Sequence, residues 1–153
     1  DQLAKVDGMV QAALEAGAKA VVGGSKIDGP GYFFEPTVLA DVDNQMAIAQ
    51  DEVFGPVLCV IPYRDEDDAV RIANDSIFGL SGVVMGADDD RATAVARRIR
   101  SGTISVNGGL YYGADAPFGG YKQSGIGREM GVAGMEEYLE SKTLALPAPA
   151  EAS

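Results

Sequence analysis

Glu52 and Phe54 are the side chains of this sequence whose types and spacing most clearly suggest chemistry. They stand two residues apart, directly before a Gly-Pro pair and an apolar run at 56–63. A carboxylate in such a place can accept two charge-assisted hydrogen bonds from neighbouring hydroxyl groups. An aromatic ring two residues further on can lie against a flat heterocycle. From the residues alone, a solvated acid and a core ring are the more ordinary interpretation.

Cys59 is the one cysteine of the sequence and therefore its one candidate for a thiol nucleophile. It lies inside the apolar run, where a cysteine usually acts as a small buried hydrophobic side chain with a raised pKa. We therefore expect Cys59 to be structural, and no other residue of the chain is predicted to be catalytic. The sequence contains no histidine, which excludes Ser-His and Cys-His catalysis and histidine-ligated metal sites within this chain.

Gly125, Gly127 and Gly131 lie around the start of a predicted helix and are spaced like the glycines of a dinucleotide-binding loop. Such a loop requires a strand directly before the glycines and an acidic residue about 20 residues later. The residues that precede Gly125 do not have the pattern of a strand. We therefore interpret these glycines as turn and close-packing residues.

The composition limits the classes of protein to which the chain can belong. Its 153 residues, 46% of them hydrophobic, suit one domain with a sizeable core. A net charge of −11 with only 12 Lys and Arg disfavours nucleic-acid and anionic-membrane partners. No apolar run is long enough for a membrane span, and no signal peptide is visible. A single cysteine fits a reducing compartment, so we expect a cytoplasmic protein.

Three apolar runs have the length of buried strands, and two helical segments separate them. The strands are expected at 56–63, 81–86 and 102–107, and the helices begin after Asp65 and after Asp88 or Asp89. Those carboxylates can cap the helices that they precede. Strands and helices in alternation, with short connections, predict an α/β fold: a parallel βαβαβ sheet with flanking helices.

Other segments extend this framework in both directions. Before it, we expect a helix over 3–14 that stops at Gly17 and strands near 18–22 and 37–39. After it, we expect a long loop at 107–127, a helix at 128–139 and an alternating strand near 142–150. Ligands of parallel sheets gather beyond the carboxyl ends of the strands, so the long glycine-rich loop is a candidate for function.

Five segments, in this order and at this spacing, resemble the C-terminal part of the NAD(P)-dependent aldehyde dehydrogenase superfamily. They are GYFFEPTVLADV, DEVFGPVLCV, ANDSIFGLSGVV, SGTISVN and APFGGYKQSGIGREMG. The resemblance implies that residues 1–140 are the C-terminal part of a catalytic domain and that 141–153 form an oligomerisation strand and tail. It also implies that Glu52 binds the nicotinamide-ribose hydroxyls and that Phe54 packs against the nicotinamide.

The resemblance further implies the chemistry of a longer parent enzyme. That enzyme would use NAD or NADP to oxidise an aldehyde to a carboxylic acid, through a thiohemiacetal and a thioester on a cysteine. No segment of this chain matches the Gly-Gln-x-Cys loop that holds the family's nucleophile. This chain would supply the nicotinamide-ribose contacts and, through Leu110, Tyr112 and Phe118, a wall of the substrate tunnel. We expect the isolated chain to be inactive.

Two alternatives stay open. The chain can be a standalone, non-catalytic interaction module derived from the same fold, which composition does not exclude. The parent can also be a semialdehyde or acyl-CoA-forming member of the superfamily, because this part of the sequence does not define the substrate. The intact enzyme is expected to bind an aldehyde and to be a homodimer or homotetramer.

Overall fold

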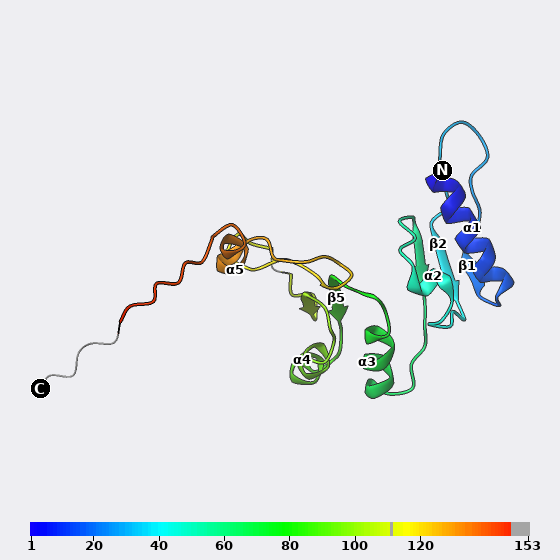
Figure 1. Ribbon diagram of the computed structural model, residues 1–153. Coiled ribbons are helices and arrows are strands. Elements are labelled where there is room, and N and C mark those ends of the chain that lie inside the picture. The colour runs from blue at the N-terminus through cyan, green and yellow to red at the C-terminus, as the bar shows by residue number, and fades with distance from the viewer. Residues whose placement is uncertain (111, 148–153) are drawn as a thin grey trace, which may run out of the picture.

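The computed structural model describes residues 1–110 and 112–147, and its elements form two groups along the chain (Figure 1). The N-terminal group, residues 1–61, contains α1 (Gln2–Glu15), β1 (Lys19–Val22), β2 (Thr37–Ala40), α2 (Ala47–Gln50) and β3 (Val57–Cys59). The C-terminal group, residues 64–139, contains α3 (Glu66–Asn74), β4 (Phe78–Gly79), β5 (Ser81–Val84), α4 (Asp89–Ala96), β6 (Thr103–Val106), β7 (Tyr121–Lys122) and α5 (Gly131–Glu136). No helix of the described residues is long and apolar enough to cross a membrane.

The core of the N-terminal group lies between α1 and the sheet. Val6, Val10 and Ala13 recur at helical spacing and are buried on one face of α1. They pack in one cluster with Leu39 of β2, which is fully buried. Burying a side chain of this size contributes about 1.5–3 kcal/mol. The predicted stop after this helix is confirmed, because Gly17 takes the left-handed backbone conformation with φ +106°.

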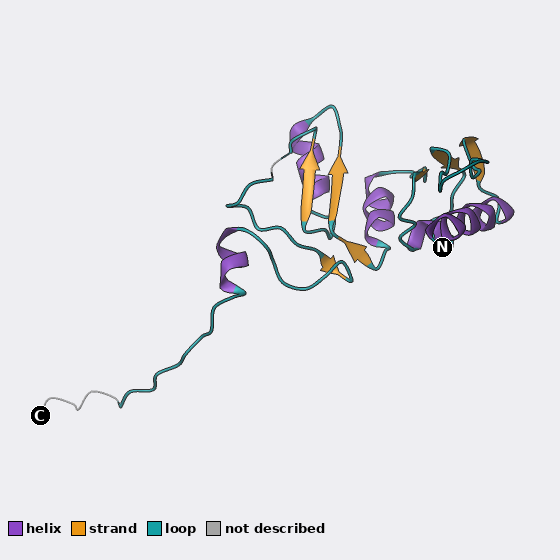
Figure 2. Cartoon of the chain, turned by 90° about the horizontal axis from the view of Figure 1, so that it is seen from above, coloured by secondary structure: helices purple, strands orange, loops and turns teal. Residues whose placement is uncertain are grey.

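The α/β class is confirmed, and parallel strand pairs occur in both groups. β2 pairs in parallel with β3 and antiparallel with β1. In the C-terminal group β5 and β6 run parallel, with α4 as the crossover between them (Figure 2). A two-stranded antiparallel pair, β4 with β7, completes the described strands.

The strands are distributed differently from the single βαβαβ sheet that the sequence predicts. β3 pairs with β2, whereas β5 pairs with β6 in a separate sheet. The periodicity of a strand shows which residues are buried but not which strand lies beside it. α3 carries the chain away from β3 before β5 begins, so these two strands do not become neighbours. β3 is also shorter than the predicted 56–63, because its described partner β2 ends at Ala40.

The predicted helix caps are confirmed. The Asp65 carboxylate accepts a hydrogen bond of 2.9 Å from the backbone N–H of Asp68, and Asp88 accepts one of 2.7 Å from Arg91. Both bonds satisfy an N–H group that a helix start leaves without a partner. Arg98, which follows α4, also pairs with Asp67 of α3 at 2.5 Å, so the two helices are joined directly.

The segment after α3 joins the two groups. The carboxylate of Asp75 accepts hydrogen bonds from the side-chain amides of Asn44 and Gln45 at 3.0 and 2.7 Å. Its backbone carbonyl accepts another from the Gln50 amide at 2.9 Å. Three amides of the N-terminal group therefore converge on one residue of the C-terminal group. Net stabilisation by each such bond is about 0.5–1.5 kcal/mol.

The C-terminal end differs from its prediction. The helix expected over 128–139 is shorter, because Met130 and Gly131 both have φ near +60° (63° and 62°) and a right-handed helix cannot continue backwards through them. Residues 142–147 of the predicted alternating strand have no regular secondary structure, and 148–150 lie outside the described residues.

Candidate functional site

The loop that carries Glu52 and Phe54 lies between α2 and β3 and is held by side chains of α1. The ammonium group of Lys5 donates a hydrogen bond of 2.7 Å to the backbone carbonyl of Glu52. The amide of Gln2 donates to the carbonyls of Val53 and Phe54, at 2.9 and 3.0 Å. Three consecutive carbonyls of the loop are therefore bound by the first turns of one helix.

Gly55 lets this loop approach the helix closely. A Cβ atom at Gly55 would lie 2.7 Å from the Cγ2 atom of Val6, a distance that forces one of the two groups to move. On the other side, the carbonyl of Pro56 accepts a 2.8 Å hydrogen bond from the N–H of Thr37 in β2. The loop is thus fixed between the helix and the sheet.

The two candidate side chains point away from the core. Phe54 is 77% exposed, so the alternative that it is a core ring is wrong. Its φ of +52° is rare for a bulky residue and costs about 1–2 kcal/mol. Glu52 is exposed, and its carboxylate has no hydrogen-bond or ion-pair partner in the described part of the chain. A free carboxylate and an exposed ring, two residues apart in the sequence, therefore extend from a restrained backbone.

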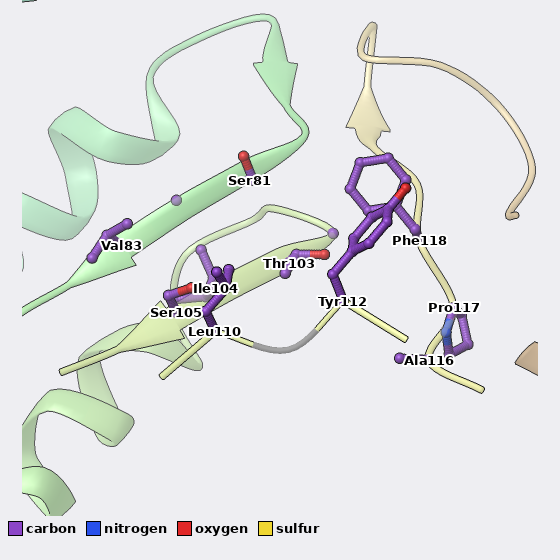
Figure 3. A pocket seen from close by; sticks show the side chains of 12 residues that line it. Ser81, Val83, Thr103, Ile104, Ser105, Leu110, Tyr112, Ala116, Pro117 and Phe118 are labelled. Atoms are coloured by element: carbon purple, nitrogen blue, oxygen red, sulfur yellow. The ribbon is translucent and has the colours of Figure 1, made fainter. Parts of the chain in front are cut away.

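A second wall of the candidate site forms where the 107–127 loop crosses β5 and β6. Leu110, Tyr112 and Phe118 all line one cavity of about 580 Å³, together with residues of both strands (Figure 3). The rings of Tyr112 and Phe118 meet edge to face, with centroids 5.6 Å apart. The structure thus brings together the three residues predicted for the substrate wall. The volume falls within the range typical of small-molecule sites.

Backbone hydrogen bonds hold this second wall in place. The N–H and carbonyl groups of Phe118 exchange two hydrogen bonds of 2.8 Å with those of Glu129. The N–H of Gly131 donates a further 2.8 Å bond to the carbonyl of Ala114. The loop is therefore fixed beyond Tyr112 at two points, although it is long and rich in glycine.

Hydroxyl groups in this cavity were missed by the sequence reasoning. Ser81 of β5 and Thr103 and Ser105 of β6 line the cavity beside the aromatic rings. A signal was available, because polar residues in a buried strand are unusual and Thr103 and Ser105 alternate with apolar neighbours. Ser81 also lines a second cavity, of about 540 Å³, whose wall includes Glu52. Ser81 thus lies on the wall of both cavities.

Cys59 lies where a structural role was expected. It ends β3, is half-buried and packs against the core cluster. Burial raises the pKa of its thiol, which keeps the thiol protonated and a poor nucleophile at neutral pH. Among the described residues, no group of three His, Cys, Asp or Glu side chains is placed to hold a metal ion.

The glycines of the 125–131 segment serve turns and close packing, as interpreted from the sequence. Gly125 and Gly127 have φ values of +126° and +76°, which few other residues adopt. A Cβ at Gly131 would lie 3.1 Å from the ring of Pro117. The expectation that no strand precedes Gly125 is wrong, because β7 does, but that strand has only two residues and the helix that follows has only six.

The sequence of the chain is similar to a known family and to proteins within it. The model of the family described as "Aldehyde dehydrogenase family" matches residues 1–144. A succinate-semialdehyde dehydrogenase of Paenarthrobacter nicotinovorans is 46% identical over 146 residues, which cover 95% of this chain and 32% of that protein. A 3-succinoylsemialdehyde-pyridine dehydrogenase of a Pseudomonas species is 48% identical over 146 residues, with 94% and 30% covered.

Solved structures of aldehyde dehydrogenases are also similar to this chain. A betaine aldehyde dehydrogenase of Staphylococcus aureus in complex with NAD⁺ superposes with a TM-score of 0.86 and 46% identity, covering 92% of this chain and 29% of that one. An aldehyde dehydrogenase of Mycobacterium tuberculosis complexed with NAD⁺ has a TM-score of 0.88 and 45% identity, with 99% and 32% covered. The chain thus spans about a third of the length of the curated relatives it matches.

Proposed function

Because the chain belongs to the aldehyde dehydrogenase family, we propose that it is part of a longer enzyme that oxidises an aldehyde to a carboxylic acid. The family match over residues 1–144 and the share of the relatives that is covered support this proposal. In the intact enzyme this chain would supply one wall of the cofactor site and one wall of the substrate site. The cofactor, NAD or NADP, supplies the hydride acceptor when it is bound.

The loop at 51–56 fits the nicotinamide end of such a cofactor. The unpartnered carboxylate of Glu52 would accept hydrogen bonds from the two ribose hydroxyls, and a charged acceptor makes these bonds strong and orienting. The exposed ring of Phe54 would lie against the nicotinamide and limit its rotation. NAD is favoured over NADP by the NAD⁺ complexes of the related structures.

The rest of the cofactor would be held by other parts of the enzyme. The glycine turns at 125–131 lie between a strand of only two residues, β7, and a helix of only six residues, which is too little regular structure for a pyrophosphate site. The nucleophile would also come from elsewhere, because burial disfavours the thiolate of Cys59. The thiohemiacetal and thioester would form on that other cysteine, and the isolated chain would have no dehydrogenase activity.

The cavity lined by Leu110, Tyr112 and Phe118 would hold the body of the aldehyde. Its wall is mainly apolar, with the hydroxyl groups of Ser81, Thr103 and Ser105 among the polar exceptions. Such a lining favours an aldehyde with an apolar or aromatic body. A semialdehyde substrate is the second candidate, and the named activities of the two curated relatives favour it.

We also propose that the intact enzyme is a cytoplasmic homo-oligomer whose subunits meet partly through 141–153. Apolar side chains of α5 and the following segment are exposed: Val132, Met135, Tyr138, Leu139, Leu144 and Leu146. Residues 142–147 lack a partner strand within the described chain. An unpaired strand-like segment gains backbone hydrogen bonds when it joins the edge of another sheet. Removing 143–153 from the intact enzyme should lower its sedimentation coefficient, whereas an unchanged species would contradict this assembly.

The observation that carries the proposed function is that Glu52 has a free carboxylate and Phe54 an exposed ring on one restrained loop, in a chain that the family model matches. The test is to purify the full-length protein and supply NAD with a series of aldehydes, including semialdehydes. We expect NADH to form together with the carboxylic acid. Binding of NAD without turnover of any aldehyde would overturn the dehydrogenase and favour the standalone interaction module.

A further inference from the structure

Asn74, Asp75 and Ser76, at the C-terminal end of α3, connect the parts of the chain that carry the two walls of the candidate site. We call these three residues the junction. α3 lies between the N-terminal group and the strands β5 and β6 (Figure 1). Within the described part of the chain, the hydrogen bonds that join the N-terminal group to the C-terminal group all end at Asp75.

On one side, the junction holds the start of the loop at 51–56, which we call the cofactor loop. Gln50, the last residue of α2, directly precedes this loop. Its side-chain amide donates hydrogen bonds to the backbone carbonyls of Asp75 and Asn44, at 2.9 and 2.6 Å. The Asn44 amide in turn donates to the carboxylate and to the carbonyl of Asp75, at 3.0 and 3.1 Å. The cofactor loop therefore starts from a residue that is tied to the end of α3.

On the other side, the junction holds segments of the substrate wall. The side chain of Asn74 accepts a 2.7 Å hydrogen bond from the N–H of Arg100 and donates one of 2.9 Å to the carbonyl of Arg98, shortly before β6 begins. The ammonium group of Lys122, in β7, donates to the carbonyls of Asn74 and Ser76 at 2.8 and 2.9 Å. The approach to β6 and the end of the long loop with its aromatic rings are thus tied to the same three residues.

The second cavity, of about 540 Å³, has a wall that combines both groups of the chain. Glu52 comes from the cofactor loop, Ser76 from the junction, and Ser81 from β5, where it also lines the substrate cavity. The placement of the cofactor loop relative to the substrate wall therefore depends on how the two groups are joined. Asp75 lines neither of these two cavities, so any effect that it has on them is indirect.

We propose that Asp75 is a positioning residue, the centre of a junction that sets the distance between the cofactor loop and the substrate wall. This inference rests on the proposed function, because it takes the two walls to hold the cofactor and the aldehyde. Hydride transfer needs the reacting atoms about 3–3.5 Å apart, and a misplacement of about 1 Å can slow a reaction about 100-fold. A junction between the two walls acts on this distance.

The expected signature in the intact enzyme is a loss of rate without a loss of binding. In Asp75→Ala the cofactor loop keeps its bonds to α1, and the long loop keeps those between Phe118 and Glu129. The dissociation constant for NAD and the KM for the aldehyde should each change less than about threefold, whereas single-turnover hydride transfer should slow about tenfold. Gln50→Met, a milder second variant, removes one donor at the start of the cofactor loop and should slow hydride transfer about three- to tenfold.

Asp75→Asn and Asp67→Ala are the controls. Asp75→Asn keeps an acceptor oxygen for the amides of Asn44 and Gln45, so its rate should stay within about threefold of wild type. Asp67→Ala removes a carboxylate of α3 that pairs with Arg98, and both of these residues belong to the C-terminal group. The midpoint of thermal unfolding should fall to a similar extent in Asp67→Ala and Asp75→Ala, but only Asp75→Ala should slow hydride transfer.

The outcomes for the junction and for the cofactor assignment are distinguishable. Rates of Asp75→Ala and Gln50→Met equal to that of Asp67→Ala would overturn the positioning role, and so would a dissociation constant for NAD that rises as much as the rate falls. Either result leaves the assignment of Glu52 intact if Glu52→Gln slows hydride transfer. If Glu52→Gln has no effect while Asp75→Ala slows hydride transfer at unchanged binding, the junction keeps its role and the assignment of Glu52 fails.

Discussion

The rings of Tyr112 and Phe118 meet edge to face, with centroids 5.6 Å apart and an angle of 74° between their planes. Such pairs contribute about 0.5–1.5 kcal/mol beyond the area they bury. Both rings line the cavity that extends along β5 and β6, so each ring holds the other in place against it (Figure 3). The contact therefore shapes the wall that we assign to the aldehyde.

Shortening either ring should change the substrate preference of the intact enzyme. Tyr112→Ala and Phe118→Ala each open the cavity and remove the edge-to-face contact. The relative kcat/KM for short, long and aromatic aldehydes should then shift by about 10-fold or more, because one buried side chain alters binding by 1–3 kcal/mol. Tyr112→Phe keeps the contact and is the control. An equal fall for every aldehyde would mean that the rings serve only to pack the loop.

Substituting Gly55 should disturb the loop that carries Glu52 and Phe54. The added methyl group of Gly55→Ala would meet Val6 at 2.7 Å and push the loop away from α1. We expect a loss of stability of about 1–3 kcal/mol and slower hydride transfer. Val6→Ala makes room for that methyl group, so the double variant should recover part of the rate.

Gly8 provides a control for the effect of replacing a glycine with alanine. Gly8 lies in α1, and a Cβ there would meet nothing within 4 Å. Gly8→Ala should therefore leave hydride transfer unchanged and stabilise the helix by about 0.5–1 kcal/mol. Equal effects of Gly8→Ala and Gly55→Ala on the rate would show that the contact with Val6 is unimportant.

Asp68 should make the stability of the enzyme depend on acid pH. Hydrogen bonds from Arg64, and then from Arg71, hold the pKa of this carboxyl well below its usual range. Ionised Asp68 therefore stabilises the folded state above the unfolded-state pKa of about 3.9, and this contribution is lost as the pH falls towards the lower folded-state pKa. Asp68→Asn should lower the unfolding midpoint at neutral pH.

The pH dependence of the unfolding midpoint shows whether Asp68 stabilises the fold through its charge or only through packing. The difference in midpoint between wild type and Asp68→Asn should shrink as the pH falls from about 5. Asp90→Asn makes the same charge change at an exposed position and should have little effect. A difference for Asp68→Asn that stays constant down to strongly acid pH would contradict the ion-pair account.

Cys59 should prove dispensable for catalysis. Because burial raises the pKa of its thiol, alkylation of Cys59 in the folded enzyme should be slow at neutral pH and faster under alkaline conditions. Cys59→Ala should cost about 1 kcal/mol of stability through lost packing and leave kcat near wild type. Loss of turnover in this variant, with the fold intact, would assign the cysteine a role that its surroundings disfavour.

Local signals in the sequence predicted the local features of the fold. Asp65 and Asp88 bond to N–H groups three residues further along, so the caps depend only on neighbouring residues. The burial of Val6 and Val10 likewise follows from the helical period. The pairing of β3 with β2 could not be predicted in this way, because a buried strand has the same pattern beside any partner.

In the candidate site, too, the sequence predicted some features and not others. The motif around Glu52 and Phe54 marked the residues, and the resemblance suggested which loop residues would meet in one cavity. The left-handed backbone at Phe54 had no signal, since this conformation is unusual for a bulky residue. The bonds from Gln2 and Lys5 span about fifty residues and were also missed, because an exposed helical Lys or Gln normally faces solvent.

The most direct test of the cofactor assignment is the rate of hydride transfer in a single turnover of the intact enzyme with Glu52→Gln. Asp51→Asn is the matched control, because it removes an exposed carboxylate one residue away. We expect Glu52→Gln to slow hydride transfer by about 10-fold or more, the loss of a hydrogen bond to a charged acceptor, with a smaller change in the dissociation constant for NAD. A Glu52→Gln rate equal to those of Asp51→Asn and the wild type would contradict the account.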